Sequence, residues 1–433
     1  MSAPSHKWDT SNRKHMTIES SDQLYYLPTV VDPSTAERLV EGLVKFNVEE
    51  VGSAQWIEQH VNIEKLNLQA HQSAMTNSDE YVIEALLTFD KVKVLIHDLL
   101  IIEAWKQYVF PLLKERVASR NSIRIYFVLF HEATVVNLLE VLLYHRHVCD
   151  SCGEFMLEVV DYVARKLTRL NGGYDFRSIE PRASLSKSPG LDSAAEQAAA
   201  MAAVTPEVET MTQFREIEFR VCISSCALAR FICEHADAMP LNVISRITDT
   251  HDLLILLVPL IENPPWTRRL EDGKWQKLID QKWTAVAPID LLKVTKLEGQ
   301  PWLGLYHLLA KETFRKQYHL NSFRKNQVLR VRKYINEVLL DQLPFLADIQ
   351  RYMDELSVTD VPEPLSVGDS AFLLQQVAVT REGLLKGKNW SEVADLQMEN
   401  VYTMTDKTDK DLIKMSDLYS DDLAGGVMDP QDS

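Results

Sequence analysis

Two amphipathic helices in direct succession are encoded by residues Asn321–Leu356, NSFRKNQVLRVRKYINEVLLDQLPFLADIQRYMDEL. Each carries an apolar stripe with a period near 3.6 residues, which predicts one buried helical face. The first stripe comprises Val328, Val331, Ile335, Leu339 and Leu343, and the second comprises Leu346, Ile349, Met353 and Leu356. Pro344 ends the first helix and suits the first turn of the second, because its ring clashes with a preceding helical turn. Two such stripes without a spacer predict a helical hairpin.

Similar stripes recur along most of the chain and predict an all-α protein. The architecture is either an irregular helical solenoid of armadillo or HEAT type or a multi-helix bundle, because no strict repeat period is evident. The segment Ile123–Phe130, IRIYFVLF, is too short to distinguish a strand from a buried helix. Residues 266–288 depart from helical spacing around the turn signal Asp272-Gly273, so we expect a small β-ribbon there.

Shifts in composition divide the chain into five parts. Polar residues 1–22 predict a disordered tail, and residues 23–170 predict an N-terminal helical half. Residues 171–208 are rich in Gly, Ser, Pro and Ala, which is typical of a flexible linker. A C-terminal helical half follows at residues 209–400, and residues 401–433 predict an acidic disordered tail.

Composition excludes several classes of protein. The chain has 433 residues, a formal net charge of −16 and only 14 glycines. This acidic balance disfavours nucleic-acid binding, which requires a basic surface to displace counterions. The longest apolar run, Leu253–Ile261, is far shorter than the ~20 residues of a membrane span. We therefore expect a cytoplasmic protein with reduced thiols and no membrane span.

Cysteine and histidine spacing gives one weak metal hypothesis. His145, His147, Cys149 and Cys152 could supply zinc ligands, but a structural site normally draws on two such clusters. The other cysteines, Cys222, Cys226 and Cys233, lie at helical spacing and predict buried thiols. No phosphate-binding glycine loop, nucleophile elbow or kinase motif is present in the sequence. We therefore expect no catalytic residue, no cofactor and no metal.

The clearest charge feature is a basic stretch from Lys311 to Lys333, where Glu312 is the one acidic residue. A solvated helix face is one interpretation. The other is a surface that docks an acidic partner, since a positive patch in an acidic chain attracts anionic groups. The residues expected to bind such a partner are Lys316, Arg324, Lys325, Arg330, Arg332 and Lys333.

Four segments resemble the family of zinc finger MYND domain-containing protein 10, a family of dynein arm assembly factors. They are Gly52–Ala70, His131–His145, Trp283–Leu309 and Leu339–Gln350, in the family's order. The resemblance implies a non-enzymatic scaffold for cytoplasmic pre-assembly of inner and outer axonemal dynein arms, needed for cilium motility. The implied partners are dynein arm chains, a ninety-kilodalton heat-shock chaperone, an immunophilin co-chaperone and a leucine-rich-repeat assembly factor. The implied location is cytoplasmic, near centriolar satellites or the ciliary base.

The resemblance covers the helical body of this family. The family's MYND finger is a cysteine-dense zinc module, and this sequence has no cysteine after Cys233. We therefore expect no MYND finger within residues 1–433 and assign no zinc ligand. In the family, the finger is the part that is thought to bind the leucine-rich-repeat assembly factor. We therefore name no residue of this chain as a contact for that partner. The alternative function is a general armadillo-like interaction adaptor in trafficking or signalling.

Overall fold

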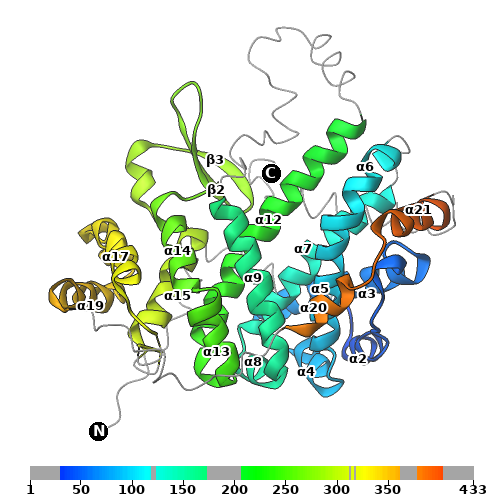
Figure 1. Cartoon of the computed structure of the whole chain (residues 1–433), viewed down its shortest axis with the longest axis horizontal. Coiled ribbons are helices and arrows are strands. Elements are labelled where there is room, and N and C mark those ends of the chain that lie inside the picture. The colour runs from blue at the N-terminus through cyan, green and yellow to red at the C-terminus, as the bar shows by residue number, and fades with distance from the viewer. Residues whose placement is uncertain are drawn as a thin grey trace, which may run out of the picture.

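The structure is a computed structural model that describes residues 30–118, 123–172, 206–311, 314–315, 318–360 and 378–402. Figure 1 shows a helical protein with one small sheet, so the expected all-α class with a β insertion is confirmed. The predicted N-terminal tail, nearly all of the predicted linker and residues 403–433 of the predicted acidic tail lie outside the described residues.

The first part of the described chain is a series of helices whose apolar faces meet in one core. Side-chain caps fix where several of them begin: Asp32 accepts a hydrogen bond from Thr35 N at 3.0 Å, and Ser53 accepts one from Trp56 N at 3.3 Å. The elements are α2 (Pro33–Glu41), the 3₁₀ turn η2 (Val48–Glu50), α3 (Ala54–Thr76), α4 (Tyr81–Thr88), α5 (Val92–Ala104), the π-helical turn η3 (Trp105–Val109), α6 (Phe110–Ala118), α7 (Ile123–Leu143), α8 (Arg146–Cys152), the 3₁₀ turn η4 (Gly153–Phe155) and α9 (Met156–Asn171).

Helix α7 contains the segment Ile123–Phe130, whose conformation the sequence leaves open. The segment is helical because it is part of a longer apolar run that packs against α3, α5 and α12. Among the described helices, Arg124–Leu143 is long and apolar enough to cross a membrane, with a mean hydropathy of 1.6. This apolar stretch is 78% buried inside the protein. A helix at the centre of a folded core is just as long and apolar as a membrane span.

Helix α12 (Pro206–Glu234) runs through the middle of the molecule (Figure 1). It contacts α6, α7 and α9 from the first part of the chain and α15 (Lys296–Ala310) from the second. In a solenoid each unit contacts only its neighbours. A central helix that joins distant parts of the chain instead corresponds to a multi-helix bundle. Cys222, Cys226 and Cys233 are buried in this packing, as their spacing predicts.

After α12 the chain forms shorter elements. They are the 3₁₀ turn η6 (Ala236–Ala238), α13 (Leu241–Ser245), the π-helical turn η7 (Arg246–Thr250), α14 (Leu253–Glu262), strands β1 (Thr267–Arg269), β2 (Trp275–Ile279) and β3 (Lys282–Val286), the 3₁₀ turn η8 (Pro288–Leu292), α15, α17 (Ser322–Val331), the 3₁₀ turn η9 (Arg332–Tyr334), α18 (Glu337–Gln342) and α19 (Leu346–Val358). The predicted ribbon is a three-stranded antiparallel sheet in the order β1-β2-β3.

Two tight turns connect the three strands. The expected turn at Asp272-Gly273 joins β1 to β2, and Gly273 has a φ of 83°, which glycine adopts without strain. The second turn, at Asp280 and Gln281 with φ of 46° and 63°, adds β3. The sequence pattern missed it because such turns normally carry Asn-Gly or Asp-Gly.

The hairpin at Asn321–Leu356 is present, but its first helix is broken. The helix that Asn321 caps, α17, ends at Val331. The break follows because Asn336 caps α18, accepting a hydrogen bond from Leu339 N at 3.0 Å, and such a side chain competes with a continuing helix. The prediction of one continuous helix is therefore wrong. All five residues of its stripe are nevertheless buried, and α17 contacts α19.

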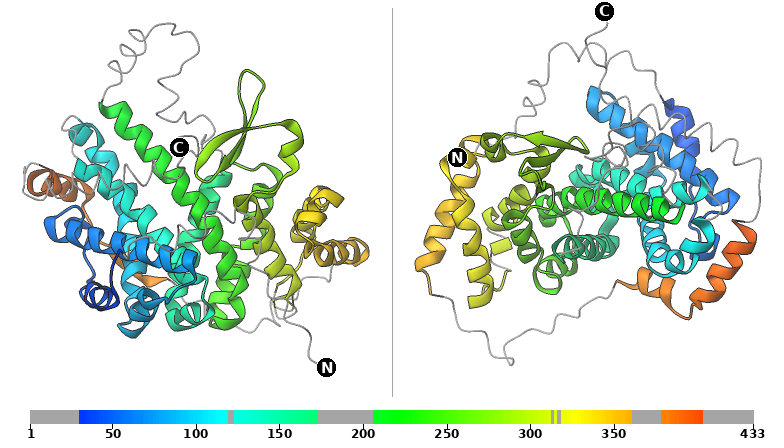
Figure 2. Two further views of the ribbon diagram at one scale, coloured as in Figure 1. Left: turned by 180° about the vertical axis from the view of Figure 1, so that it is seen from behind. Right: turned by 90° about the horizontal axis from the view of Figure 1, so that it is seen from above.

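Residues 378–402, which we call the C-terminal strap, return to the N-terminal helices. The strap contains α20 (Val379–Leu385) and α21 (Trp390–Asn400), which contact α5, α6, η2 and η3. Figures 1 and 2 show it on the side opposite α17 and α19. Gln397 fixes the strap: its Oε1 accepts from Trp105 Nε1 at 2.7 Å, and its Nε2 donates to Val48 O at 2.8 Å.

The strap also covers Gly52. This glycine has a φ of 83°, and a Cβ there would lie 3.0 Å from Val401 Cγ1 and 3.4 Å from Tyr402 Oη. We predict that Gly52→Ala lowers the free energy of unfolding more than Gly273→Ala does. Both glycines have a φ of 83°, so both substitutions carry the cost of an alanine at positive φ, about 1–2 kcal/mol. A Cβ at Gly273 would make only an ordinary contact, 3.7 Å from Arg269 Nη2, so the clash adds about 1–3 kcal/mol at Gly52 alone. Urea unfolding of both variants measures the difference, and equal losses would contradict the packing of the strap.

Four helical elements meet at a buried cluster of charges. Glu132 of α7 receives Lys106 Nζ of η3 at 2.7 Å and Lys166 Nζ of α9 at 2.6 Å. Glu218 of α12 lies 3.3 Å from Lys106 Nζ and 3.1 Å from Arg169 of α9. Burial would raise the pKa of Glu132, but the charges of Lys106 and Lys166 hold that pKa well below its usual value. The cluster therefore stays ionised in the core.

We predict that Glu132→Gln destabilises the fold by about 3–5 kcal/mol, because it leaves two buried ammonium groups with Glu218 as their main counter-charge. The matched control is Glu115→Gln on the exposed face of α6, with an effect within about 0.5 kcal/mol. Urea unfolding followed by circular dichroism measures both. Equal effects of the two substitutions would show that the buried charges do not hold the helices together.

Candidate functional site

The basic stretch lies at the edge of the molecule on α17 and η9, but Arg324 points inward. Its side chain is 14% exposed, and its Nε lies 2.7 Å from Asp252 Oδ2. It also donates to Thr248 O at 3.0 Å and lies over the Tyr318 ring. Burial raises the pKa of Asp252, and the bonds from Tyr318 and Arg324 oppose that rise. Arg324 therefore ties α17 to the start of α14.

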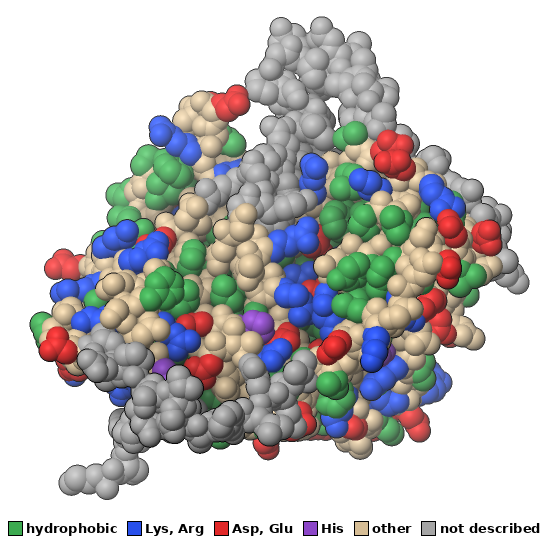
Figure 3. All heavy atoms as spheres, in the orientation of Figure 1, with side chains coloured by type: hydrophobic (Ala, Val, Ile, Leu, Met, Phe, Trp, Pro, Cys, Tyr) green, Lys and Arg blue, Asp and Glu red, His purple; other side chains and the backbone are tan. Residues whose placement is uncertain are grey.

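The other described residues that were expected to bind an acidic partner are more exposed than Arg324, and each of them lies near an acidic side chain or a backbone carbonyl. Arg330 and Lys333 both face Glu262, with Lys333 Nζ 3.8 Å from its Oε1. Arg332 pairs with Asp354 at 2.5 Å, and Lys325 Nζ donates to Thr359 O at 2.7 Å. Lys316 lies outside the described residues. Figure 3 shows basic and acidic side chains interspersed around α17 and α19, not one basic block.

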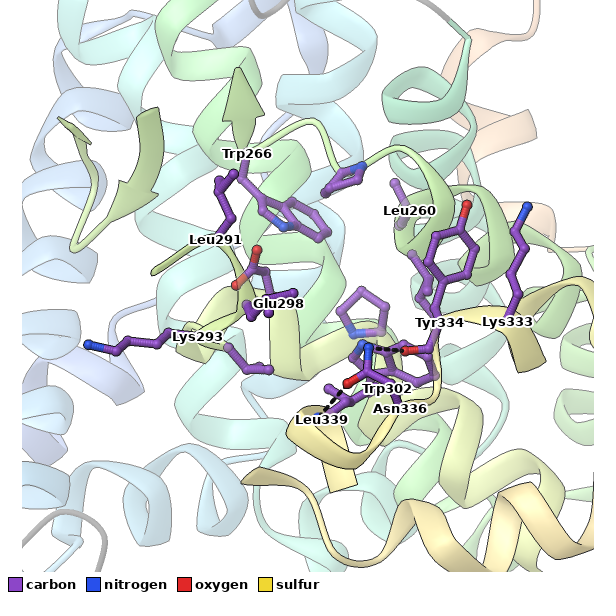
Figure 4. A pocket seen from close by; sticks show the side chains of 15 residues that line it. Leu260, Trp266, Leu291, Lys293, Glu298, Trp302, Lys333, Tyr334, Asn336 and Leu339 are labelled. Carbon is purple, nitrogen blue, oxygen red and sulfur yellow. Dashed lines mark hydrogen bonds between the residues drawn. The ribbon is translucent and has the colours of Figure 1, made fainter. Parts of the chain in front are cut away.

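Beside this surface lies a cavity of about 240 Å³ (Figure 4). The rings of Trp266, Trp302 and Tyr334 form much of its wall. It is bounded by the end of α14, the start of the sheet, η8, α15, η9 and α18. Its lining residues are Leu260, Ile261, Pro264, Trp266, Leu291, Leu292, Lys293, Val294, Glu298, Pro301, Trp302, Lys333, Tyr334, Asn336 and Leu339.

The sequence does not predict this cavity, because the positions of Trp266, Trp302 and Tyr334 do not indicate that their rings meet. One signal in the sequence is the recurrence of a Pro-Trp pair, Pro265-Trp266 and Pro301-Trp302. The spacing of these pairs does not show that they meet in the fold.

The polar groups of the cavity wall are held by the surrounding structure. Among the described lining residues Glu298 is the one carboxylate, and Lys277 Nζ neutralises it at 2.9 Å. Lys277 is buried and also donates to Leu291 O and Lys293 O, both at 2.8 Å. Glu298 Oε2 accepts from Thr295 N at 2.8 Å in the capping box that starts α15. These bonds fix η8 against the sheet and α15.

Exposed apolar side chains surround the mouth of the cavity. Leu292 lines the cavity and is 54% exposed, while Ile289 in the same 3₁₀ turn is 79% exposed. Residues three apart eclipse in a 3₁₀ helix, so both side chains share one face. Gln342 Nε2 donates to Leu292 O and to Val338 O, both at 2.9 Å, which brings exposed Val338 to the same region.

Trp266 has an unusual environment. The residue is 1% exposed, and its indole Nε1 has no acceptor among the described residues. A buried donor without a partner costs about 1–3 kcal/mol. Figure 4 shows the ring projecting into the cavity.

The weak zinc hypothesis at His145, His147, Cys149 and Cys152 is not supported by their placement. Cys149 and Cys152 are buried, whereas His147 is exposed on the same helix. Burial raises the pKa of Cys149 to about 12 and that of Cys152 to about 11, which disfavours the thiolate form that binds metal. Within the described residues no group of three or more His, Cys, Asp or Glu side chains is placed to hold a metal ion.

Comparison with known proteins identifies the family. The chain is 31% identical over 360 residues to the zinc finger MYND domain-containing protein 10 homolog of Drosophila melanogaster. The match covers 82% of this chain and 74% of the relative. The chain belongs to the zinc finger MYND domain-containing protein 10 family.

No protein-family model matches the chain, and no solved structure matches it. The name of the family implies zinc, but the described residues of this member offer no fitting ligand group. Two of the segments that carry the resemblance, Trp283–Leu309 and Leu339–Gln350, contribute Leu291, Trp302 and Leu339 to the cavity wall.

The ion pairs of the basic stretch lead to a prediction. Arg324→Ala should lower the free energy of unfolding by about 2–3 kcal/mol, because it removes the ion pair with the half-buried Asp252 and leaves Thr248 O without its Arg324 donor. Arg332→Ala should cost about 1 kcal/mol or less, since its pair with Asp354 is half-exposed. Chemical denaturation of the two variants measures the difference. Equal losses would show that Arg324 does not fasten α17 to α14.

Proposed function

We propose that this protein is a non-enzymatic scaffold for the cytoplasmic pre-assembly of axonemal dynein arms. The observation that carries the proposal is its membership of the zinc finger MYND domain-containing protein 10 family. The resemblance implies that this family matures inner and outer arm dyneins before they reach the cilium. The protein would act in the cytoplasm, near centriolar satellites or the ciliary base.

The character of the cavity supports a scaffold. An enzyme site brings together polar groups with perturbed pKa values. The described lining of this cavity is mainly aromatic and aliphatic, and its carboxylate is already paired with Lys277. Aromatic residues that meet in a largely apolar pocket are typical of the centre of a protein–protein contact.

The implied partners are dynein arm chains, the ninety-kilodalton heat-shock chaperone and its immunophilin co-chaperone, and a leucine-rich-repeat assembly factor. Assembly requires binding a client and a chaperone together. A client and a chaperone could bind at the same time, because the α17–α19 hairpin and the C-terminal strap lie on opposite sides of the bundle (Figure 2). The alternative is a general interaction adaptor, which would use the same surfaces for other partners.

We predict that the tagged chain, expressed in cells forming motile cilia, co-purifies with dynein heavy and intermediate chains and with the chaperones. Quantitative mass spectrometry provides the measurement, with the tag alone and cells without motile cilia as controls. Loss of the chain should also deplete assembled arms in the cytoplasm. Recovery of chaperones without dynein chains, together with normal arms in depleted cells, would favour the general adaptor.

A further inference from the structure

We propose that the cavity between η8, α15 and η9 binds a short acidic segment of a partner protein. One apolar side chain of that segment enters the cavity, and an acidic neighbour pairs with Lys333 at the mouth. This inference concerns a binding site and its ligand chemistry, and it does not depend on a role in dynein assembly.

The size and lining of the cavity indicate a side chain as its occupant. At about 240 Å³ it is smaller than the roughly 300–1,000 Å³ of small-molecule sites. Trp266 precedes β1, Trp302 lies in α15 and Tyr334 lies in η9, and the three rings provide flat apolar surfaces around one space. Such rings are preferred at the centre of interfaces because they bury much area with few rotatable bonds.

The mouth extends the apolar surface beyond the cavity itself. Ile289, Leu292 and Val338 are all exposed, although the residues around them are fastened by Gln342 and Lys277. Because the backbone around them is already fixed, covering these side chains costs little backbone entropy. They would cover residues on either side of the entering side chain.

Charge selects an acidic segment. Lys293 is 79% exposed, but its Nζ is already paired with Asp290 Oδ1 at 2.8 Å. Lys333 is 64% exposed, and its Nζ lies 3.8 Å from Glu262 Oε1. Glu262 faces both Lys333 and Arg330, so one carboxylate serves two cations and this corner keeps a positive excess. In a chain of net charge −16, a local positive excess favours an acidic ligand over a basic one.

The test uses purified full-length chain and a random peptide library displayed on phage. We expect enriched peptides with one large apolar residue flanked by Asp or Glu. Affinity of a synthesised enriched peptide, measured by fluorescence polarisation, should fall at least about tenfold for Leu292→Asp and for Lys333→Glu. Binding to the wild-type chain should weaken with added salt, and less so for Lys333→Glu.

Matched controls lie far from the cavity. Leu241→Asp replaces another exposed leucine, at the start of α13, and Lys386→Glu replaces an exposed lysine of the C-terminal strap. Both should bind the peptide as the wild type does, and thermal melts should show all four variants folded. No enrichment, basic flanks, or equal binding by all variants would overturn the proposal. A dimer in sedimentation that Leu292→Asp dissociates would also overturn it, since the face would then bind a second copy.

Discussion

The buried charge cluster around Glu132 and Glu218 is the constraint on which the bundle depends. Removing an ion from water costs several kcal/mol, so each buried charge must meet an opposite one with correct geometry. Lys106, Lys166 and Arg169 supply those charges from η3 and α9. Apolar contacts persist when two helices shift slightly against each other, whereas ion pairs at these short distances would break. We infer that the cluster fixes the relative positions of α7, α9 and α12, and through α12 the position of α15.

Much of the helical core was predictable because periodicity reports burial directly. The two stripes of Asn321–Leu356 are buried even though the helix breaks within the first of them. The break itself depends on whether Asn336 caps a new helix or lies within an old one, and spacing does not decide this. The turn at Asp280 and Gln281 was missed for a similar reason, since non-glycine residues take a left-handed conformation there only in this tertiary setting.

The candidate site was less predictable than the core. A run of Lys and Arg in sequence indicates a basic surface, but the acidic partners come from distant segments: Asp252, Glu262 and Asp354. As a result, Arg324 forms an ion pair inside the fold, whereas the other basic residues of the run are exposed near the cavity. The aromatic wall combines residues about 70 positions apart, which no local pattern brings together. A surface made by tertiary contacts can be recognised only in the fold.

The C-terminal strap has a consequence for synthesis of the chain. Gln397 donates to Val48 O across 349 positions, so the surface around Trp105 is completed only by residues made late. At ribosomal rates of about 5–20 residues per second, the N-terminal helices wait roughly 20–70 s for this cover. During that time apolar surface from η2, η3 and α6 is open to other chains. During synthesis on the ribosome this apolar surface therefore stays uncovered until the strap has been made.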